Sequence, residues 1–329
     1  MTETFGVQDS VELAVVERGG FVESRHAGSA IVLNPGGDIV ARLGNPDALI
    51  LPRSSLKPLQ AVAVVTAGAA LEGERLALAT ASHHGTDRHA AVVRDMLAAV
   101  GLTEDALGCP ASWPSDTAAR DAMVRDHLDP AAVRHNCSGK HAAMLSACVA
   151  TGWDTHGYLD PVHPLQLHIR EVIERLTGEK IAATVIDGCG APVHALSLTG
   201  LARGIHRVGT SSERSPFALH RVAGALVRTV RENPWTIHGP GQSDTVMIER
   251  YGVFSKLGAE GVQIMVAPDG TTVALKTLDG SLRAAPLVAL QLLANAGAIT
   301  SADAVEAAAL PMFAVQGGGQ DVGRIRATV

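Results

Sequence analysis

The chain has 329 residues, a net charge of −6 and 47% apolar residues, which is typical of a globular protein with a sizeable core. Aromatic residues make up only 3%, which argues against a base-stacking surface, and the negative charge argues against phosphate binding. No apolar run reaches the roughly 18 residues of a membrane helix. We therefore expect no nucleic-acid or membrane partner, and a start without signal-peptide features predicts a cytoplasmic protein.

The N-terminal part of the chain predicts strands followed by a helix. Residues 11–43 alternate in polarity and are rich in Val and Ile, with a turn at 34–38. Residues 55–70 then follow a helical pattern. Ser54 lies at the start of this predicted helix, and Lys57 lies three residues on along the same face.

The middle of the chain is predicted to be mostly helical, and strands return towards the C-terminus. Thr86 is expected to cap a helix that continues to Val100. Further helices are expected at about 116–127, 138–152, 164–177, 198–207, 216–231 and 284–296. Short strands are expected near 182–186, 252–256, 261–267, 272–277 and 322–328.

This order of elements predicts an α+β fold in one domain covering residues 1–329. We expect an antiparallel sheet that joins N-terminal strands from about 8–50 with C-terminal strands from about 245–329. The residues between, from about 55 to 235, are expected to form helices that flank the sheet.

Lysine is scarce, since only five of the 27 basic residues are lysines. Arginine cannot lose its proton in a protein, whereas a buried lysine can act as a base or bind a metal. Where arginine is the usual basic residue, a retained lysine therefore points to chemistry. Lys180 and Lys276 are the two that we interpret as ordinary solvated charges.

Three segments carry candidate hydroxyl and amine groups. Ser54 and Lys57 form a Ser-x-x-Lys pattern, in which the amine can take the hydroxyl proton and the helix start can stabilise negative charge. The pattern is weak alone, because a chain of this length contains roughly one by chance. Ser82 ends an apolar run, where it either faces a cleft or satisfies backbone groups in a turn. Lys256 lies in a Gly-rich stretch between two predicted strands, a place more typical of surface charges.

Cysteines mark two more segments. Cys137 precedes a predicted helix, and Cys189 lies between glycines after a predicted strand. Cysteines in such turns are expected to be more exposed than core cysteines, so thiolate chemistry or metal ligation is plausible. Cys148, in an Ala-rich helical stretch, is interpreted as a small core residue, whereas Cys109 is undecided.

Together these segments resemble one family, the bacterial serine/lysine L-asparaginases of the rhizobial type, also called asparaginase II. The similarity runs from about residue 20 to the end of the chain, in matching order and spacing. The matching stretches are Arg53-Ser54-Ser55-Leu56-Lys57-Pro58-Leu59-Gln60, Ser82-His83, Asn136-Cys137-Ser138-Gly139-Lys140-His141-Ala142, Asp187-Gly188-Cys189-Gly190-Ala191-Pro192, and Lys256 with Gly258-Ala259-Glu260-Gly261.

The resemblance implies a fold similar to serine β-lactamases and glutaminases, and hydrolysis of L-asparagine to L-aspartate and ammonia through an acyl-enzyme. It implies two catalytic tandems, Ser54 with Lys57 and Ser82 with Lys256. It also implies a zinc ion, which is not expected to supply the nucleophile, and a homodimer. The zinc ligands implied by the resemblance are Cys137, Lys140 and Cys189.

Substrate contacts and substrate range are less constrained by the sequence. We expect Arg53 or His141 to orient the substrate. This chain carries His84 where family members often have a smaller residue, and Gln242 where they often have arginine. Both changes bear on substrate range more than on reaction type.

Three alternative functions remain at this stage. A glutaminase, another amidohydrolase or a penicillin-recognising enzyme on the same fold is the first; the penicillin-recognising enzyme is expected to carry a Lys-Thr-Gly strand, whereas this chain has Lys276-Thr277-Leu278. A zinc hydrolase in which the serines are bystanders is the second. A non-catalytic binding protein on the same fold is the third.

Overall fold

The computed structural model describes residues 3–329. It confirms the α+β class and the antiparallel sheet that joins the two ends of the chain. The sheet has the strand order β10–β11–β1–β2–β9–β8–β7, with β3 paired to β2. These strands are β1 (Val11–Arg18), β2 (Phe21–Leu33), β3 (Ile39–Leu43), β7 (Phe254–Gly258), β8 (Val262–Val266), β9 (Thr272–Thr277), β10 (Ala314–Gly317) and β11 (Gln320–Ala327).

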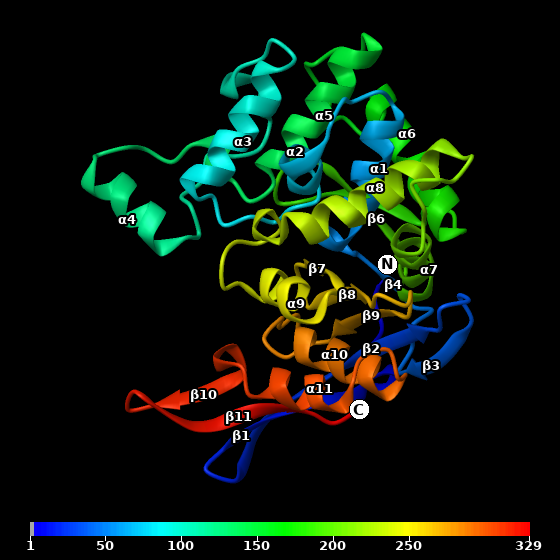
Figure 1. Ribbon diagram of the computed structural model, residues 1–329, viewed down its shortest axis with the longest axis vertical. Coiled ribbons are helices and arrows are strands. Elements are labelled where there is room, and N and C mark those ends of the chain that lie inside the picture. The colour runs from blue at the N-terminus through cyan, green and yellow to red at the C-terminus, as the bar shows by residue number, and fades with distance from the viewer. Residues whose placement is uncertain (1–2) are drawn as a thin grey trace.

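The helical part of the chain lies above this sheet in Figure 1. Thr86 caps α3 as expected, because its hydroxyl accepts a hydrogen bond from the backbone N–H of His89. The helices are α1 (Lys57–Thr66), α2 (Gly73–Leu78), α3 (Asp87–Ala98), α4 (Thr117–Arg125), α5 (Ser138–Thr151), α6 (Pro164–Thr177), α7 (Leu198–Gly209) and α8 (Ala218–Glu232).

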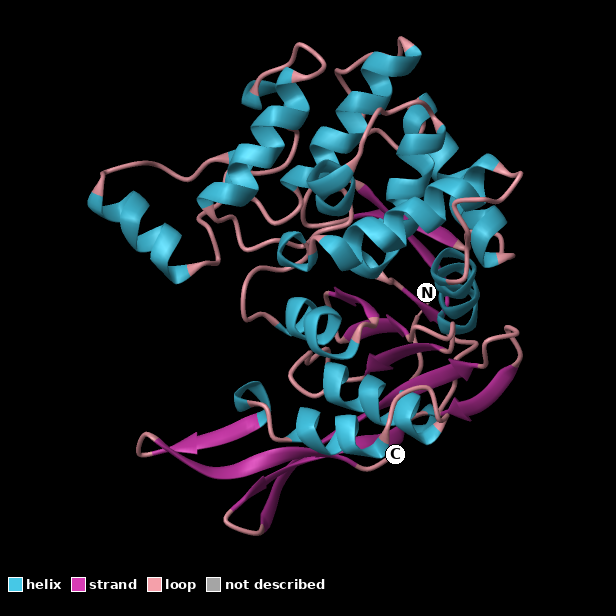
Figure 2. Ribbon diagram, in the orientation of Figure 1, coloured by secondary structure: helices cyan, strands magenta, loops and turns pink. Residues whose placement is uncertain are grey.

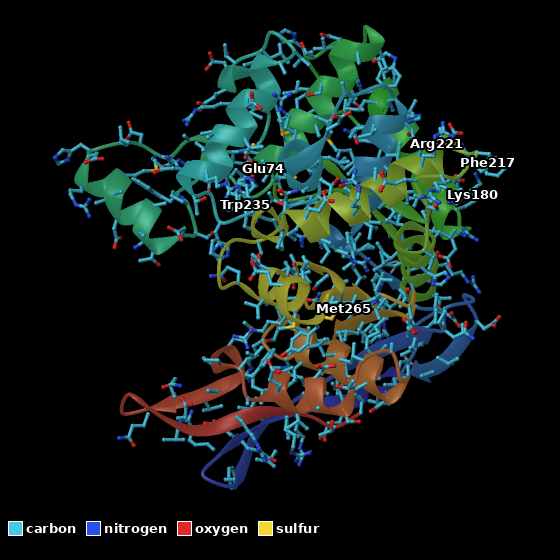
Figure 3. The ribbon with its side chains drawn as sticks, in the orientation of Figure 1. Glu74, Lys180, Phe217, Arg221, Trp235 and Met265 are labelled. Carbon is cyan, nitrogen blue, oxygen red and sulfur yellow. The ribbon has the colours of Figure 1, made fainter. Side chains whose placement is uncertain are left out.

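Three more helices pack against strands of the sheet: α9 (Ser243–Tyr251), α10 (Ala285–Asn295) and α11 (Ser301–Ala308). Of these, only α10 was expected from the sequence. The central strands β8 and β9 are buried on both faces, and successive side chains of each strand point to opposite sides. On β8, Ile264 packs towards the helical part, whereas Met265, labelled in Figure 3, packs in the core that contains the residues of α10.

A second, small sheet lies within the helical part, where Figure 2 shows strands among the helices. Its order is β4–β6–β5, formed by β4 (Leu49–Ile50), β6 (Pro192–Ser197) and β5 (Ala183–Ile186). Only β5 was expected. All six residues of β6 are buried, so the strand has no polar alternation to reveal it.

The edge strand β7 meets the helical part of the molecule. It packs against α9 and against η2, a short 3₁₀ helix of Arg53–Leu56 that precedes α1. Gly258 makes this approach possible, since a Cβ atom there would lie 2.3 Å from the carbonyl oxygen of Pro52. No helix among residues 3–329 has the length and apolar character needed to cross a membrane.

Candidate active site

Ser54 lies in the tight turn that leads into α1. It belongs to η2 rather than to the α-helix, so the expected helix start is shifted by a few residues. The preceding residue, Arg53, has a φ of 53°, a left-handed conformation that is uncommon for a residue other than glycine. Such strained positions often occur at functional sites, which is consistent with the candidate role of Ser54.

Ser82 lies between two buried lysine amines. The Nζ atom of Lys57 and the Nζ atom of Lys256 each lie 3.0 Å from Oγ of Ser82. Lys57 also donates to the carbonyl oxygen of Ala81, and Lys256 donates to that of Leu257 at 2.7 Å. The structure therefore joins elements far apart in the sequence into one polar cluster, and Ser82 does not simply satisfy backbone groups.

The four candidate catalytic residues are not all joined in the expected pairs. Ser82 and Lys256 are hydrogen-bonded as expected. Lys57 is bonded to Ser82, and within residues 3–329 no hydrogen bond joins Lys57 to Ser54. Catalytic hydrogen bonds are often loose before substrate binds, so the Ser54–Lys57 tandem stays a prediction.

The electrostatic setting favours proton transfer by Lys256. Burial of its amine, together with the nearby charge of Lys57, lowers the pKa of Lys256 to about 7, although the carboxylate of Asp244 acts in the opposite direction. The cause is removal of the charged amine from water. Near neutral pH this amine can therefore both accept and release a proton.

The two candidate cysteine ligands lie together with Lys140. Nζ of Lys140 donates to Sγ of Cys189 at 3.1 Å. A hydrogen bond from Cys189, and then the charges of Lys57 and Lys140, lower the pKa of Cys137 well below its usual value despite burial. Burial opposes the charge on Lys140, but Cys137 and Cys189 outweigh it and raise the pKa of Lys140.

This donor set fits a soft divalent ion, since it offers two sulfur atoms and an amine nitrogen in one buried cluster. Among the described residues, no group of three or more His, Cys, Asp or Glu could hold a metal, so Lys140 would have to complete the site. The zinc ion stays a prediction. The expectation that Cys137 and Cys189 are more exposed than core cysteines is wrong, because both are buried.

The loop that carries Cys189 is tied to the turn that carries Ser54. Nε of Arg53 donates to Oδ1 of Asp187 at 2.8 Å, and Glu260 lies 3.9 Å from the same guanidinium group. Arg53, Glu260 and Lys276 also line a cavity of about 430 Å³. The structure thus gives Arg53 a partner within the protein, and its substrate contact stays a prediction.

His141 is fully buried, and its Nδ1 atom lies 2.6 Å from the hydroxyl oxygen of Tyr158. Burial and then the charge of Lys140 lower the pKa of His141 well below its usual value, so the ring is neutral. Its Nε2 atom has no hydrogen-bond partner among the described residues. A contact between His141 and substrate also stays a prediction.

The two positions that depart from the family pattern lie close together. A Cβ atom added to Gly239 would lie 3.5 Å from Cβ of His84 and 3.7 Å from Cγ of Gln242. The ring of His84 meets the ring of His238 edge-on, with 4.7 Å between their centroids. These residues surround the backbone that pairs with the Ser82 segment, because the N–H of His84 donates to the carbonyl of His238.

Sequence reasoning missed Asp244. This residue lies in the first turn of α9, is fully buried, and has a carboxylate oxygen 3.9 Å from Nζ of Lys256. An acidic residue two positions after Gln242 was visible in the sequence, but an acid at a helix start is common and gives no hint of a lysine partner. Only the tertiary structure brings the two together.

No curated protein matches the chain. Similar solved structures include a glutaminase from Bacillus, with 11% identity over 83% of this chain and 92% of that one, at a TM-score of 0.46. A β-lactamase from Mycobacterium bovis has 13% identity over 82% of this chain and 94% of that one, at a TM-score of 0.38. Mglu in its glutamate form has 12% identity over 83% of this chain and 61% of that one, at a TM-score of 0.46.

The family comparison is more decisive than these distant structures. The profile described as L-asparaginase II matches residues 14–327, nearly the whole chain, and this range contains every candidate residue discussed above. The chain therefore belongs to the L-asparaginase II family, and it is an amidohydrolase of the asparaginase type.

Proposed function

We propose that this protein hydrolyses the side-chain amide of L-asparagine through an acyl-enzyme formed on Ser54. The observation that carries the proposal is the hydroxyl of Ser82 held 3.0 Å from the amines of both Lys57 and Lys256. A buried hydroxyl between two amines is a path for a proton, and amide hydrolysis needs one to move from the nucleophile to the leaving nitrogen.

In the first half-reaction, Oγ of Ser54 forms a bond to the amide carbon while Lys57 takes the hydroxyl proton. Backbone N–H groups at the start of α1 stabilise the oxyanion. The carbon–nitrogen bond then breaks, and the nitrogen receives a proton through Ser82 and Lys256 and leaves as ammonia. The acyl group remains on Ser54 as an ester.

In the second half-reaction, water attacks the ester carbon and loses its proton to the same lysine and serine relay. The bond between the carbon and Oγ of Ser54 breaks, Ser54 regains a proton, and aspartate leaves. The amine of Lys256 suits this exchange because burial lowers its pKa to about 7.

Zinc binding by Cys137, Lys140 and Cys189 is part of the proposal. The bound ion would supply positive charge near the site and help to place the substrate. The chain's own contribution is structural: the Arg53–Asp187 pair ties the loop of Cys189 to the turn of Ser54. A substrate bound next to the Cys189 loop can therefore affect the position of Ser54.

The remaining expectations are proposals as well. We propose a single domain, a homodimer and a cytoplasmic location. The free state of all four cysteines, Cys109, Cys137, Cys148 and Cys189, supports a reducing compartment. Sedimentation of the purified protein would test the dimer.

An ammonia-release panel over asparagine, glutamine and β-aspartyl peptides, with and without added zinc, tests the substrate. We expect the highest kcat/KM with asparagine. Preference for glutamine would make the protein a glutaminase, and no release from any of them would refute the proposal. Ser54→Ala and Lys57→Ala are each expected to abolish turnover, and near-wild-type rates in either variant would end the Ser54 mechanism.

A further inference from the structure

Asp244 contacts the strand β7 on both sides of Lys256. Its Oδ1 accepts a hydrogen bond from the hydroxyl of Ser255 at 2.7 Å, and its Oδ2 accepts one from the backbone N–H of Leu257 at 2.9 Å. The side-chain amide of Gln263, on the neighbouring strand β8, also donates to Oδ1, at 3.2 Å. One carboxylate therefore fixes the two residues that flank Lys256 in the sequence.

These contacts explain why a carboxylate is tolerated inside the protein. A buried acidic group is costly unless it is paired and hydrogen-bonded. Burial favours the neutral form of Asp244, but the charge of Lys256, with help from the hydrogen bonds, outweighs burial and lowers the pKa of Asp244. Its place in the first turn of α9 adds the favourable end of the helix dipole.

The side chain of Lys256 takes no part in the hydrogen bonds of Asp244 and points towards Ser82 instead. Lys256 pairs with Ile264 across the sheet, and residues paired in this way share one face. Ile264 packs in the core of the helical part, so Lys256 also points there, towards Ser82. At 3.9 Å, its amine lies within electrostatic reach of the carboxylate but beyond hydrogen-bonding distance.

Four charged or titratable groups surround this amine: Lys57 from α1, Asp244 from α9, His238 from the preceding loop and Cys137 at the start of α5. His238 is neutral near pH 7, because burial lowers its pKa to about 4 although Asp244 opposes the shift. Of the others, Asp244 has the largest electrostatic effect on Lys256, and its effect opposes burial.

We propose that Asp244 is a positioning residue for the reaction: it clamps β7 on both sides of Lys256 and holds the amine on Ser82 with a charge that lets it keep a proton. This inference rests on the proposed function of Ser82 and Lys256 as a relay. Without the carboxylate, the amine would be more often neutral and its direction towards Ser82 less defined. Asp244 itself touches neither substrate nor the reacting atoms in this account.

The test uses Asp244→Asn, which keeps the shape and removes the charge. Lysine-selective ¹³C NMR follows the titration of Lys256, which is one of only five lysines and can be assigned with Lys256→Arg. An opposite charge within about 4–6 Å shifts a pKa by about 1–3 units, so Asp244→Asn should lower the titration midpoint of Lys256 by at least about one unit. In the dependence of kcat on pH, the change near neutral pH should shift by the same number of pH units. The change in KM should be smaller.

Ser255→Ala provides an opposite test that keeps the carboxylate. Without the hydrogen bond from Ser255, the negative charge of Asp244 is less neutralised by a donor and acts more strongly on Lys256. The titration midpoint of Lys256 should therefore move slightly upward. A purely structural disturbance would not shift the titration midpoint of Lys256 in opposite directions in Asp244→Asn and Ser255→Ala. Asp303→Asn, which removes a carboxylate from the first turn of α11, serves as the matched control and should leave both the midpoint and the activity unchanged.

An unchanged midpoint of Lys256 in folded Asp244→Asn would overturn the inference. If that variant does not fold, an unchanged or lowered midpoint in Ser255→Ala overturns it instead. The NMR readout does not depend on turnover. A wild-type protein that releases no ammonia from asparagine would therefore count against the proposed function, while the titration of Lys256 still decides the role of Asp244.

Discussion

Lys57 and Lys256 share one hydrogen-bond partner, since each amine lies 3.0 Å from Oγ of Ser82. A hydroxyl has one proton and two lone pairs, so it can accept from both amines, but it can donate to only one amine, and only when that amine is neutral. When one lysine is neutral, the two lysines therefore have different roles, one as acceptor and one as donor. This asymmetry is the physical basis of the proposed relay.

Replacing Ser82 by alanine should interrupt the relay without removing the nucleophile. General acid–base steps contribute roughly 10²–10⁴-fold to a rate, so kcat for asparagine should fall by about that factor. KM should change little, because Ser82 is assigned no contact with the substrate. Steady-state ammonia release measures both constants.

Ser146→Ala is the matched control, because Ser146 is also buried and its hydroxyl donates to the carbonyl of Ala142 within α5. Its kcat should stay close to the wild-type value. A Ser82→Ala variant that retains wild-type kcat would show that the proton takes another route.

Lys256 should make stability depend on pH. Its pKa is lowered from 10.5 to about 7 in the folded protein, mainly by burial, so between these values the unfolded chain binds more protons than the native state. The free energy of unfolding should then rise with pH from about 7 to about 10.5 as far as this group is concerned. Lys256→Met should remove this contribution, so its stability relative to the wild type should be highest near and below pH 7 and decline towards pH 10.5.

Urea unfolding of wild type and Lys256→Met at several pH values measures the difference in the free energy of unfolding, in which the titrating groups that do not interact with Lys256 cancel. Lys180→Met is the control, since the side chain of Lys180 is 89% exposed, and its difference from wild type should stay nearly flat over the same pH range. An equally flat difference for Lys256→Met would mean that its amine titrates at its ordinary value.

Local patterns in the sequence predicted those elements that depend on local signals. Thr86 and the apolar periodicity behind it predicted α3, whereas β6 was missed because a strand buried on both faces has no alternation. The scarcity of lysine pointed to chemistry at Lys57 and Lys256, but Lys276 was treated as an exception to this argument. That residue was interpreted as solvated, yet it is buried, and its amine donates to the carbonyl of Glu260 at 2.6 Å.

Contacts between segments that lie far apart in the sequence could not be predicted from these local patterns. The sequence placed Lys57 beside Ser54 because three residues separate them, but the fold directs the amine of Lys57 to Ser82. A spacing along the chain describes one element, whereas the direction of a long side chain depends on what packs around it. Asp244 was missed for the same reason, because its partners lie on β7 and β8.

Removal of zinc should affect substrate affinity more than the chemical step. We expect chelator-treated protein, and the variants Cys137→Ser and Cys189→Ser, to lose zinc in equilibrium dialysis and to show a raised KM for asparagine while keeping measurable kcat. The reason is that Ser54, not a metal-bound water, is the proposed nucleophile.

Cys148→Ala is the control for these variants, because Cys148 is buried in α5 and burial raises the pKa of its thiol to about 11. It should bind zinc like the wild type. Complete loss of kcat in zinc-free protein that remains folded would contradict the assignment and favour a zinc hydrolase.

Gly258→Ala should separate the strand of Lys256 from the turn of Ser54. The added Cβ would lie 2.3 Å from the carbonyl oxygen of Pro52 and 3.0 Å from the backbone nitrogen of Ser55, so β7 or η2 must move. Overpacking of this kind costs about 1–3 kcal/mol, and we expect a lower urea midpoint together with reduced kcat. Gly6→Ala is the control, because Gly6 has a φ of −93° and no atom of residues 3–329 lies within 4 Å of an added Cβ. Wild-type stability and activity in Gly258→Ala would show that this close approach is not needed to align the two segments.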